Sequence, residues 1–151
     1  MIIYADASAL VKRYVVETRS EDVVRLTSTA AAVATALVTR AEVAAAFAKA
    51  VRVGALDEAG ARRAQRRFAH DWSDLIRVAV TEGLVARAET LAWEYGLRGY
   101  DAIQLAAALV WRETVGHDVV LATFDRQLWD AASETGLERW PDQLPGEPRS
   151  R

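Results

Sequence analysis

Two hydrophobic patterns alternate along this chain. Short β-prone or wholly apolar runs are typical of buried strands, and longer segments with apolar residues every three or four positions are typical of amphipathic helices. The first pattern predicts strands over residues 2–5, 31–35, 75–80, 119–122 and 137–140. The second predicts helices over residues 8–15, 20–26, 38–51, 57–72, 82–95, 100–114 and 126–135. This alternation predicts an α/β domain with a central, mainly parallel sheet of about four or five short strands, covered by helices on both faces.

The chain length favours a single folded unit. With 151 residues it matches the size of one ordinary domain. Pro145, Gly146 and Pro148 interrupt any regular pattern near the end. We therefore expect a folded domain over residues 1–140 and a flexible C-terminal tail over residues 141–151.

Composition narrows the possible chemistry. The chain has no cysteine and two histidines, His70 and His117. Thiolate metal sites, disulfides, cysteine nucleophiles and three-histidine zinc sites are therefore excluded, and any chemistry must depend mainly on carboxylates and hydroxyls. The N-terminal segment reaches Asp6 without a basic start or a long apolar run. We expect no transmembrane helix and a cytoplasmic location.

Four acids lie where a parallel sheet would place a site. Asp6 and Asp125 follow predicted strands, and Glu42 and Asp101 lie in the first turns of predicted helices. Sites in such sheets form beyond the carboxyl ends of the strands. Clustered carboxylates need cations, and hard oxygen ligands suit Mg²⁺ or Mn²⁺. Paired ions of this kind cleave phosphodiester bonds in many enzymes.

Each acid also has an ordinary structural interpretation. Asp6 and Asp101 could cap the helices that follow them. Glu42, three residues after Thr39, fits a capping box, and Asp125 could be a turn residue. Position along the chain leaves these alternatives open.

Four segments occur in an order that resembles the PIN-domain family, and within it the VapC-type toxins of bacterial toxin–antitoxin pairs. They are YADASALVK (4–12), TRAEV (39–43), LRGYDAIQLA (97–106) and ATFDRQL (122–128). The resemblance implies a three-layer α/β/α fold and a metal-dependent endoribonuclease. Its catalytic, metal-binding acids carry over onto Asp6, Glu42, Asp101 and Asp125, and the polar pocket residues onto Ser8 and Thr123. Gln104 stands where the family commonly has a histidine.

The resemblance also implies a mechanism and partners. Asp6, Asp101 and Asp125 would hold Mg²⁺ or Mn²⁺, and Glu42 would hold a second ion or orient its water. A VapB-type antitoxin would bind the protein, which would also form a homodimer. Leu109 and Trp111 are candidates for the dimer surface.

Nearby cations are candidates for contacts with RNA phosphates, with a merely solvated charged surface as the alternative. These residues are Lys12, Arg13, Arg40 and Arg98. A PIN-like module that binds RNA or protein without cutting is the alternative function. Haloacid-dehalogenase-like phosphatases need a second Asp where this chain has Ser8, and response-regulator receivers need an acidic pair and a late lysine that it lacks.

Overall fold

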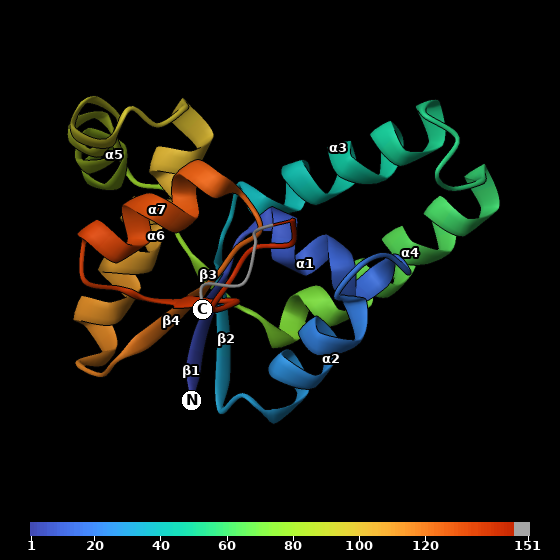
Figure 1. Cartoon of the computed structure of the whole chain (residues 1–151), viewed down its shortest axis with the longest axis horizontal. Coiled ribbons are helices and arrows are strands. Elements are labelled where there is room, and N and C mark those ends of the chain that lie inside the picture. Colours follow the sequence, from blue (N-terminus) through green and yellow to red (C-terminus); the bar gives the residue numbers. More distant parts are fainter. Residues whose placement is uncertain (147–151) are drawn as a thin grey trace.

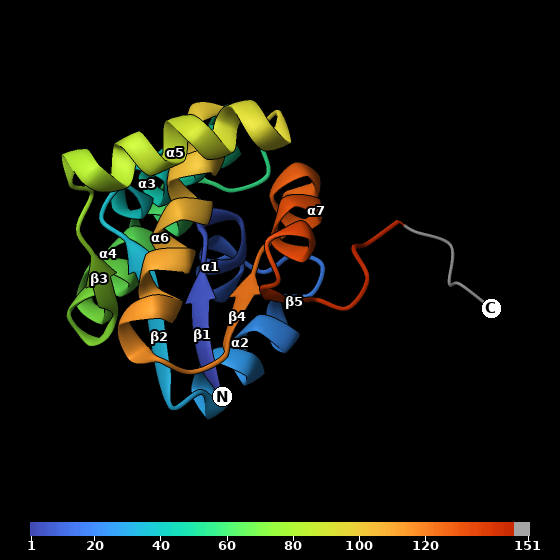
Figure 2. The same cartoon turned by 90° about the vertical axis from the view of Figure 1, so that its left-hand side faces the viewer.

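Five parallel strands form the centre of the computed structural model, which describes residues 1–146. The strands are β1 (Ile2–Ala5), β2 (Ala32–Ala36), β3 (Ile76–Val78), β4 (Val119–Ala122) and β5 (Glu138–Trp140). Their order across the sheet is β3-β2-β1-β4-β5, so β1 is central and lies between β2 and β4 (Figure 2). All pairings are parallel, which confirms the predicted α/β class and sheet.

Helices cover both faces of this sheet, as Figure 1 shows with the sheet seen edge-on. One layer contains α1 (Ala7–Tyr14), α2 (Ser20–Thr29), α3 (Thr39–Arg52) and α4 (Glu58–Asp71). The other contains α5 (Glu82–Tyr95), α6 (Gly99–Val115) and α7 (Arg126–Glu134). The three-layer α/β/α architecture is therefore confirmed.

Alternation along the strands creates two separate cores. In β1, Ile3 and Ala5 pack against the layer of α1, α3 and α4, whereas Tyr4 packs against α5, α6 and α7. Successive side chains of a strand point to opposite faces, so a strand covered on both sides is apolar throughout. Helix α6 has an unbroken run of buried residues from Gln104 to Leu109, and its alanines let it lie close to the sheet.

Burial of α6 corrects one expectation. Leu109 is 4% exposed and belongs to the core beneath α6, and Trp111 packs against the same core. The prediction of a dimer surface built on Leu109 was wrong. The pattern did not show that both sides of this helix are covered, one by the sheet and one by α5.

Local details differ modestly from the predicted elements. The expected capping box at Thr39 and Glu42 is not formed, because Val38 precedes the helix and Thr39 is a buried residue inside it. The helix predicted to reach Trp72 ends as α4 at Asp71, and a short 3₁₀ turn, η1 (Trp72–Asp74), follows.

The segment after β5 keeps contact with the fold. The indole nitrogen of Trp129 donates to the carbonyl of Pro141 at 2.7 Å, and Leu144 is buried. The expected flexible tail over residues 141–151 stays a prediction, and residues 147–151 lie outside the described residues. Over residues 1–146, no helix is both long enough and apolar enough to cross a bilayer.

Candidate metal and phosphate site

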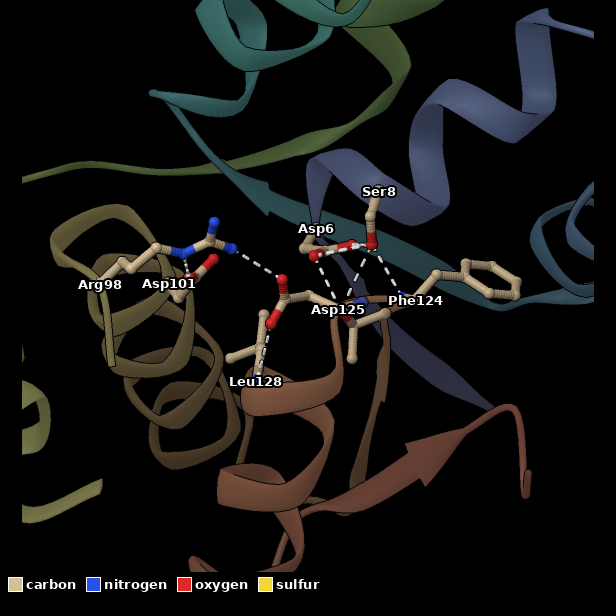
Figure 3. A network of polar contacts seen from close by, with 8 residues as sticks. Asp6, Ser8, Arg98, Asp101, Phe124, Asp125 and Leu128 are labelled. Atoms are coloured by element: carbon tan, nitrogen blue, oxygen red, sulfur yellow. Dashed lines mark hydrogen bonds and ion pairs between the residues drawn. The ribbon is translucent and has the colours of Figure 1, made fainter. Parts of the chain in front are cut away.

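Asp6 follows β1 at the carboxyl edge of the sheet. Its Oδ1 accepts from the backbone N–H of Ala9 at 3.0 Å, which caps α1. The Ser8 hydroxyl donates to the same carboxylate at 2.8 Å (Figure 3). The Thr123 hydroxyl donates to Oδ2 at 2.8 Å. The carboxylate is 4% exposed, so it is a cap and also the most buried acid of the site.

No cation offsets the charge of this buried group within the described residues. Burial raises the pKa of Asp6 to about 7, and the hydrogen bonds from Ala9, Ser8 and Thr123 oppose that rise only in part. A buried carboxylate whose donors are all neutral is costly to ionise, and a nearby metal ion would favour its charged form. The buried Asp6 carboxylate is therefore stabilised by binding either a proton or a cation.

Ser8 and Thr123 tie two chain segments together at this point. The Ser8 hydroxyl accepts from the backbone N–H of Phe124 at 2.8 Å, and the Thr123 hydroxyl accepts from that of Asp125 at 3.1 Å. The parallel pairing of β1 and β4 brings these two ends side by side. The polar pocket residues expected from the sequence therefore lie around Asp6 itself.

Glu42 lies in the first turn of α3 and is held from α6. The Gln104 side-chain amide donates to Glu42 Oε1 at 2.6 Å and to the Thr39 hydroxyl at 2.8 Å. The Gln104 side-chain oxygen, Oε1, accepts from the Tyr4 hydroxyl at 2.6 Å. Every polar atom of this buried amide has a partner, so it orients Glu42 as a fixed neutral donor. Partial burial raises the pKa of Glu42, and the Gln104 hydrogen bond opposes the rise.

Asp101 and Asp125 share one arginine. Arg98 Nε donates to Asp101 Oδ2 at 2.8 Å, and Arg98 Nη2 donates to Asp125 Oδ2 at 2.8 Å (Figure 3). Asp125 Oδ1 also accepts from the backbone N–H of Leu128 and caps α7. Asp101 does not cap α6, because it is the third residue of the helix and Arg98 is the residue before it. Partial burial raises the pKa of Asp101, and the Arg98 hydrogen bond lowers it.

All four acids line one open pocket of about 910 Å³. It runs from the sheet edge along α3, the helix that leads away from the sheet in Figure 1. Two of the four predicted phosphate-contacting cations, Lys12 and Arg98, line it. Arg13 instead pairs with Asp71, and Arg40 stacks on the Trp72 ring, so the structure does not bring these two to the pocket.

Two pocket cations were missed from the sequence. Lys49 and Arg52 lie on α3 and line the outer part of the pocket. Lys49 follows Glu42 by seven residues, about two helical turns, so helical spacing could have placed both on one face. Within residues 1–146, neither residue forms an ion pair with an acid.

The donor chemistry of the pocket fits a hard divalent ion, because it offers carboxylates and hydroxyls and no sulfur or imidazole. The acids are, however, spaced too widely to surround an ion. Over residues 1–146, no three acids or histidines converge closely enough to hold an ion as they stand. Asp101 and Asp125 each direct one carboxylate oxygen at the guanidinium of Arg98. Closing the site around an ion therefore requires side-chain movement, which the exposed Arg98 permits.

Comparisons with known proteins identify the family and the fold of this chain. A family model described as PIN domain matches residues 3–134. Ribonuclease VapC45 of Mycobacterium tuberculosis (strain CDC 1551 / Oshkosh) is 35% identical over 144 residues, which cover 95% of this chain and 97% of that protein. Among solved structures, PAE2754 from Pyrobaculum aerophilum is similar with a TM-score of 0.62 at 24% identity, covering 92% of this chain and 83% of that one. A toxin–antitoxin complex from Klebsiella pneumoniae contains a chain similar with a TM-score of 0.59 at 20% identity, covering 83% and 87%.

Proposed function

Because the chain belongs to the PIN-domain family, as its four ordered segments indicated, we propose that it is a VapC-type toxin endoribonuclease. It hydrolyses RNA phosphodiester bonds at the pocket of Asp6, Glu42, Asp101 and Asp125. One observation supports this most strongly. A carboxylate buried among neutral donors opens onto a pocket that holds three more acids, in a chain 35% identical to a ribonuclease over nearly its whole length.

The cofactor in this proposal is Mg²⁺ or Mn²⁺, held by Asp6 and Asp101 with Glu42 and Asp125. When bound, such an ion activates water and stabilises the charge on the phosphate and the leaving oxygen. The protein's own contribution is orientation. Asp6 is held by Ser8 and Thr123, and Glu42 is held by Gln104, so two of the carboxylates need little reorganisation to receive the ion.

RNA would lie along α3, with its scissile phosphate at the acids. Ala45 and Ala46 line the pocket between Glu42 and the pair Lys49 and Arg52. Their small side chains leave room for a ribose-phosphate backbone, and the cations beyond them can contact neighbouring phosphates. Lys12 is less available, because it bonds the Thr18 carbonyl and pairs with Glu17.

Cleavage mapping on total RNA tests this function. The wild-type protein should cut RNA only with Mg²⁺ or Mn²⁺ present and leave 5′-phosphate and 3′-hydroxyl ends. Asp101→Asn should reduce the initial rate at least about a hundredfold, because it removes one charged ligand from the pocket.

The matched control is Asp130→Asn, which makes the same change at an exposed acid of α7 outside the pocket. Its rate should equal that of the wild type. A protein that binds RNA but cuts it in none of these conditions would instead support the alternative, a non-catalytic PIN-like module.

Partners and location complete the proposal. A VapB-type antitoxin would bind and inhibit the protein, as suggested by the toxin–antitoxin complex that contains a similar fold. A homodimer is supported by large apolar side chains exposed around α5 and the start of α6, namely Val85, Trp93 and Tyr100. We place the protein in the cytoplasm, where its RNA substrates are.

A further inference from the structure

Arg98 forms ion pairs with two acids of the pocket, Asp101 and Asp125. It reaches Asp101 from the same helix start, three residues away, and Asp125 from the start of α7, which is 27 residues away. Two neighbouring carboxylates repel each other, and a planar guanidinium fork can neutralise both at once. Arg98 therefore does for Asp101 and Asp125 what a bound cation would do.

The ion pairs of Arg98 with Asp101 and Asp125 are easily broken. The Arg98 side chain is 71% exposed, whereas those of Asp101 and Asp125 are 14% and 24% exposed. Exposed ion pairs are weak because water and salt screen them. Since most of the Arg98 side chain is exposed, its guanidinium can swing out while its two partners remain.

We propose that Arg98 is a displaceable counter-ion, which neutralises Asp101 and Asp125 until a divalent cation replaces it and which then turns to a phosphate of the RNA. This inference rests on the proposed ribonuclease function and assigns to one side chain two roles in sequence. It accounts for the open spacing of the acids, because both Asp101 and Asp125 direct an oxygen at Arg98.

The two roles predict effects of opposite sign. Removing Arg98 removes a competitor and a like charge from the metal site, so metal should bind more tightly. The same change removes a phosphate contact, so RNA should bind more weakly. If Arg98 had a purely structural role, its removal would not strengthen metal binding and weaken RNA binding at the same time.

Calorimetric titration with Mn²⁺ alone, and then with Mg²⁺ alone, tests the first effect. Arg98→Ala should bind Mn²⁺ about three- to tenfold more tightly than the wild type. Arg98→Lys keeps the charge but loses the fork, so its affinity should lie closer to that of the wild type.

The matched control is Arg62→Ala. Arg62 is also an exposed arginine in an ion pair, with Glu58 on α4, and it lies outside the pocket. This variant has the same change in net charge and should bind Mn²⁺ as the wild type does.

Two further readouts complete the test. The metal-induced rise in melting temperature, measured against chelator, should be larger in Arg98→Ala, because Asp101 and Asp125 then repel each other when no ion is present. Binding of a non-hydrolysable RNA analogue should weaken a few-fold.

Equal Mn²⁺ affinity in Arg98→Ala and Arg62→Ala would overturn the inference, and so would equal tightening in Arg98→Ala and Arg98→Lys. If the wild type still cleaves RNA and Asp101→Asn does not, the proposed function survives that result. A wild-type protein that neither binds Mn²⁺ nor cuts RNA would instead overturn the proposed function.

Discussion

The two sides of the pocket stabilise their carboxylates in different ways. Asp6, at the end of the central strand, is buried and accepts hydrogen bonds from a backbone amide and two hydroxyls. Asp101 and Asp125, at the starts of α6 and α7, are more exposed and pair with the arginine between them. Neutral donors hold one acid and a mobile cation holds the other two.

This difference separates a fixed half of the site, which contains Asp6, from an adaptable half, which contains Asp101 and Asp125. Neutral donors position Asp6 but do not cancel its charge, so the burial cost remains and its pKa is raised. An arginine cancels charge but can leave, so Asp101 and Asp125 can exchange one cation for another. A rigid ligand that needs a metal and flexible ligands that can receive it are complementary features of one site.

The largest expected effect contrasts the two halves directly. Asp6→Asn should reduce RNA cleavage about a thousandfold or more, because Asp6 is the one acid that is buried within residues 1–146. Asp125→Asn should reduce cleavage only about tenfold, because Asp101 remains beside it to hold the ion. Initial rates on one labelled RNA at saturating Mg²⁺ measure both, and similar losses would show that the site has no fixed half.

The next effect is on stability, which should depend on pH through Asp6. The folded state keeps this proton up to about pH 7, whereas the unfolded chain releases it near pH 3.8. The folded state therefore binds more protons over this range, and the free energy of unfolding falls as pH rises from about 4 to about 7. This rise in the pKa of Asp6 corresponds to a decrease in the free energy of unfolding of up to about 4 kcal/mol.

Urea unfolding in chelator at pH 5 and pH 8 measures this loss. Asp6→Asn should flatten the pH dependence and be more stable than the wild type at pH 8, whereas Asp130→Asn should leave the dependence unchanged. Added Mg²⁺ should stabilise the wild type more at pH 8 than at pH 5, because the ion favours the charged carboxylate. A stability that rises between pH 5 and pH 8 in chelator would contradict this description of Asp6.

The smallest effect concerns cations that lie in the pocket but pair with neither half. Lys49→Ala and Arg52→Ala should each weaken RNA binding a few-fold and lower the slope of log affinity against log salt by about one. Metal affinity should not change, in contrast to Arg98→Ala. Fluorescence anisotropy over a salt series measures the slope, with Arg62→Ala as the control, and an unchanged slope would place the RNA path elsewhere.

Much of this architecture could be predicted from local patterns. Short β-prone or apolar runs identified all five strands. Strands β1 and β4 are apolar throughout because helices cover both of their faces, whereas the edge strands β3 and β5 keep charged residues. The same reasoning located Asp6 and Asp125, since parallel strands end at one edge of the sheet. Glu42 and Asp101 followed from the ordered motifs. The acids of the site are thus encoded by their positions relative to strand and helix ends.

Residues whose roles depend on the other side of the molecule could not be predicted in this way. Thr39 has the sequence context of a helix cap, yet it is buried and accepts a hydrogen bond from Gln104, which is 65 residues away. Leu109 was a candidate for a dimer surface, yet it is buried in the core and α5 packs against α6. Burial by a distant element overrides a local preference in both cases.

The sequence by itself determined the strands, the helices and which acids stand at their ends, because these follow from residue periodicity and chain direction. Only the tertiary structure decided which cations reach those acids. Arg13 and Arg40 are near site residues in sequence but point to Asp71 and Trp72, whereas Lys49 reaches the pocket because α3 runs along it. Long side chains are placed by the direction of their helix and by the partners on neighbouring elements, and neither is a property of nearby sequence.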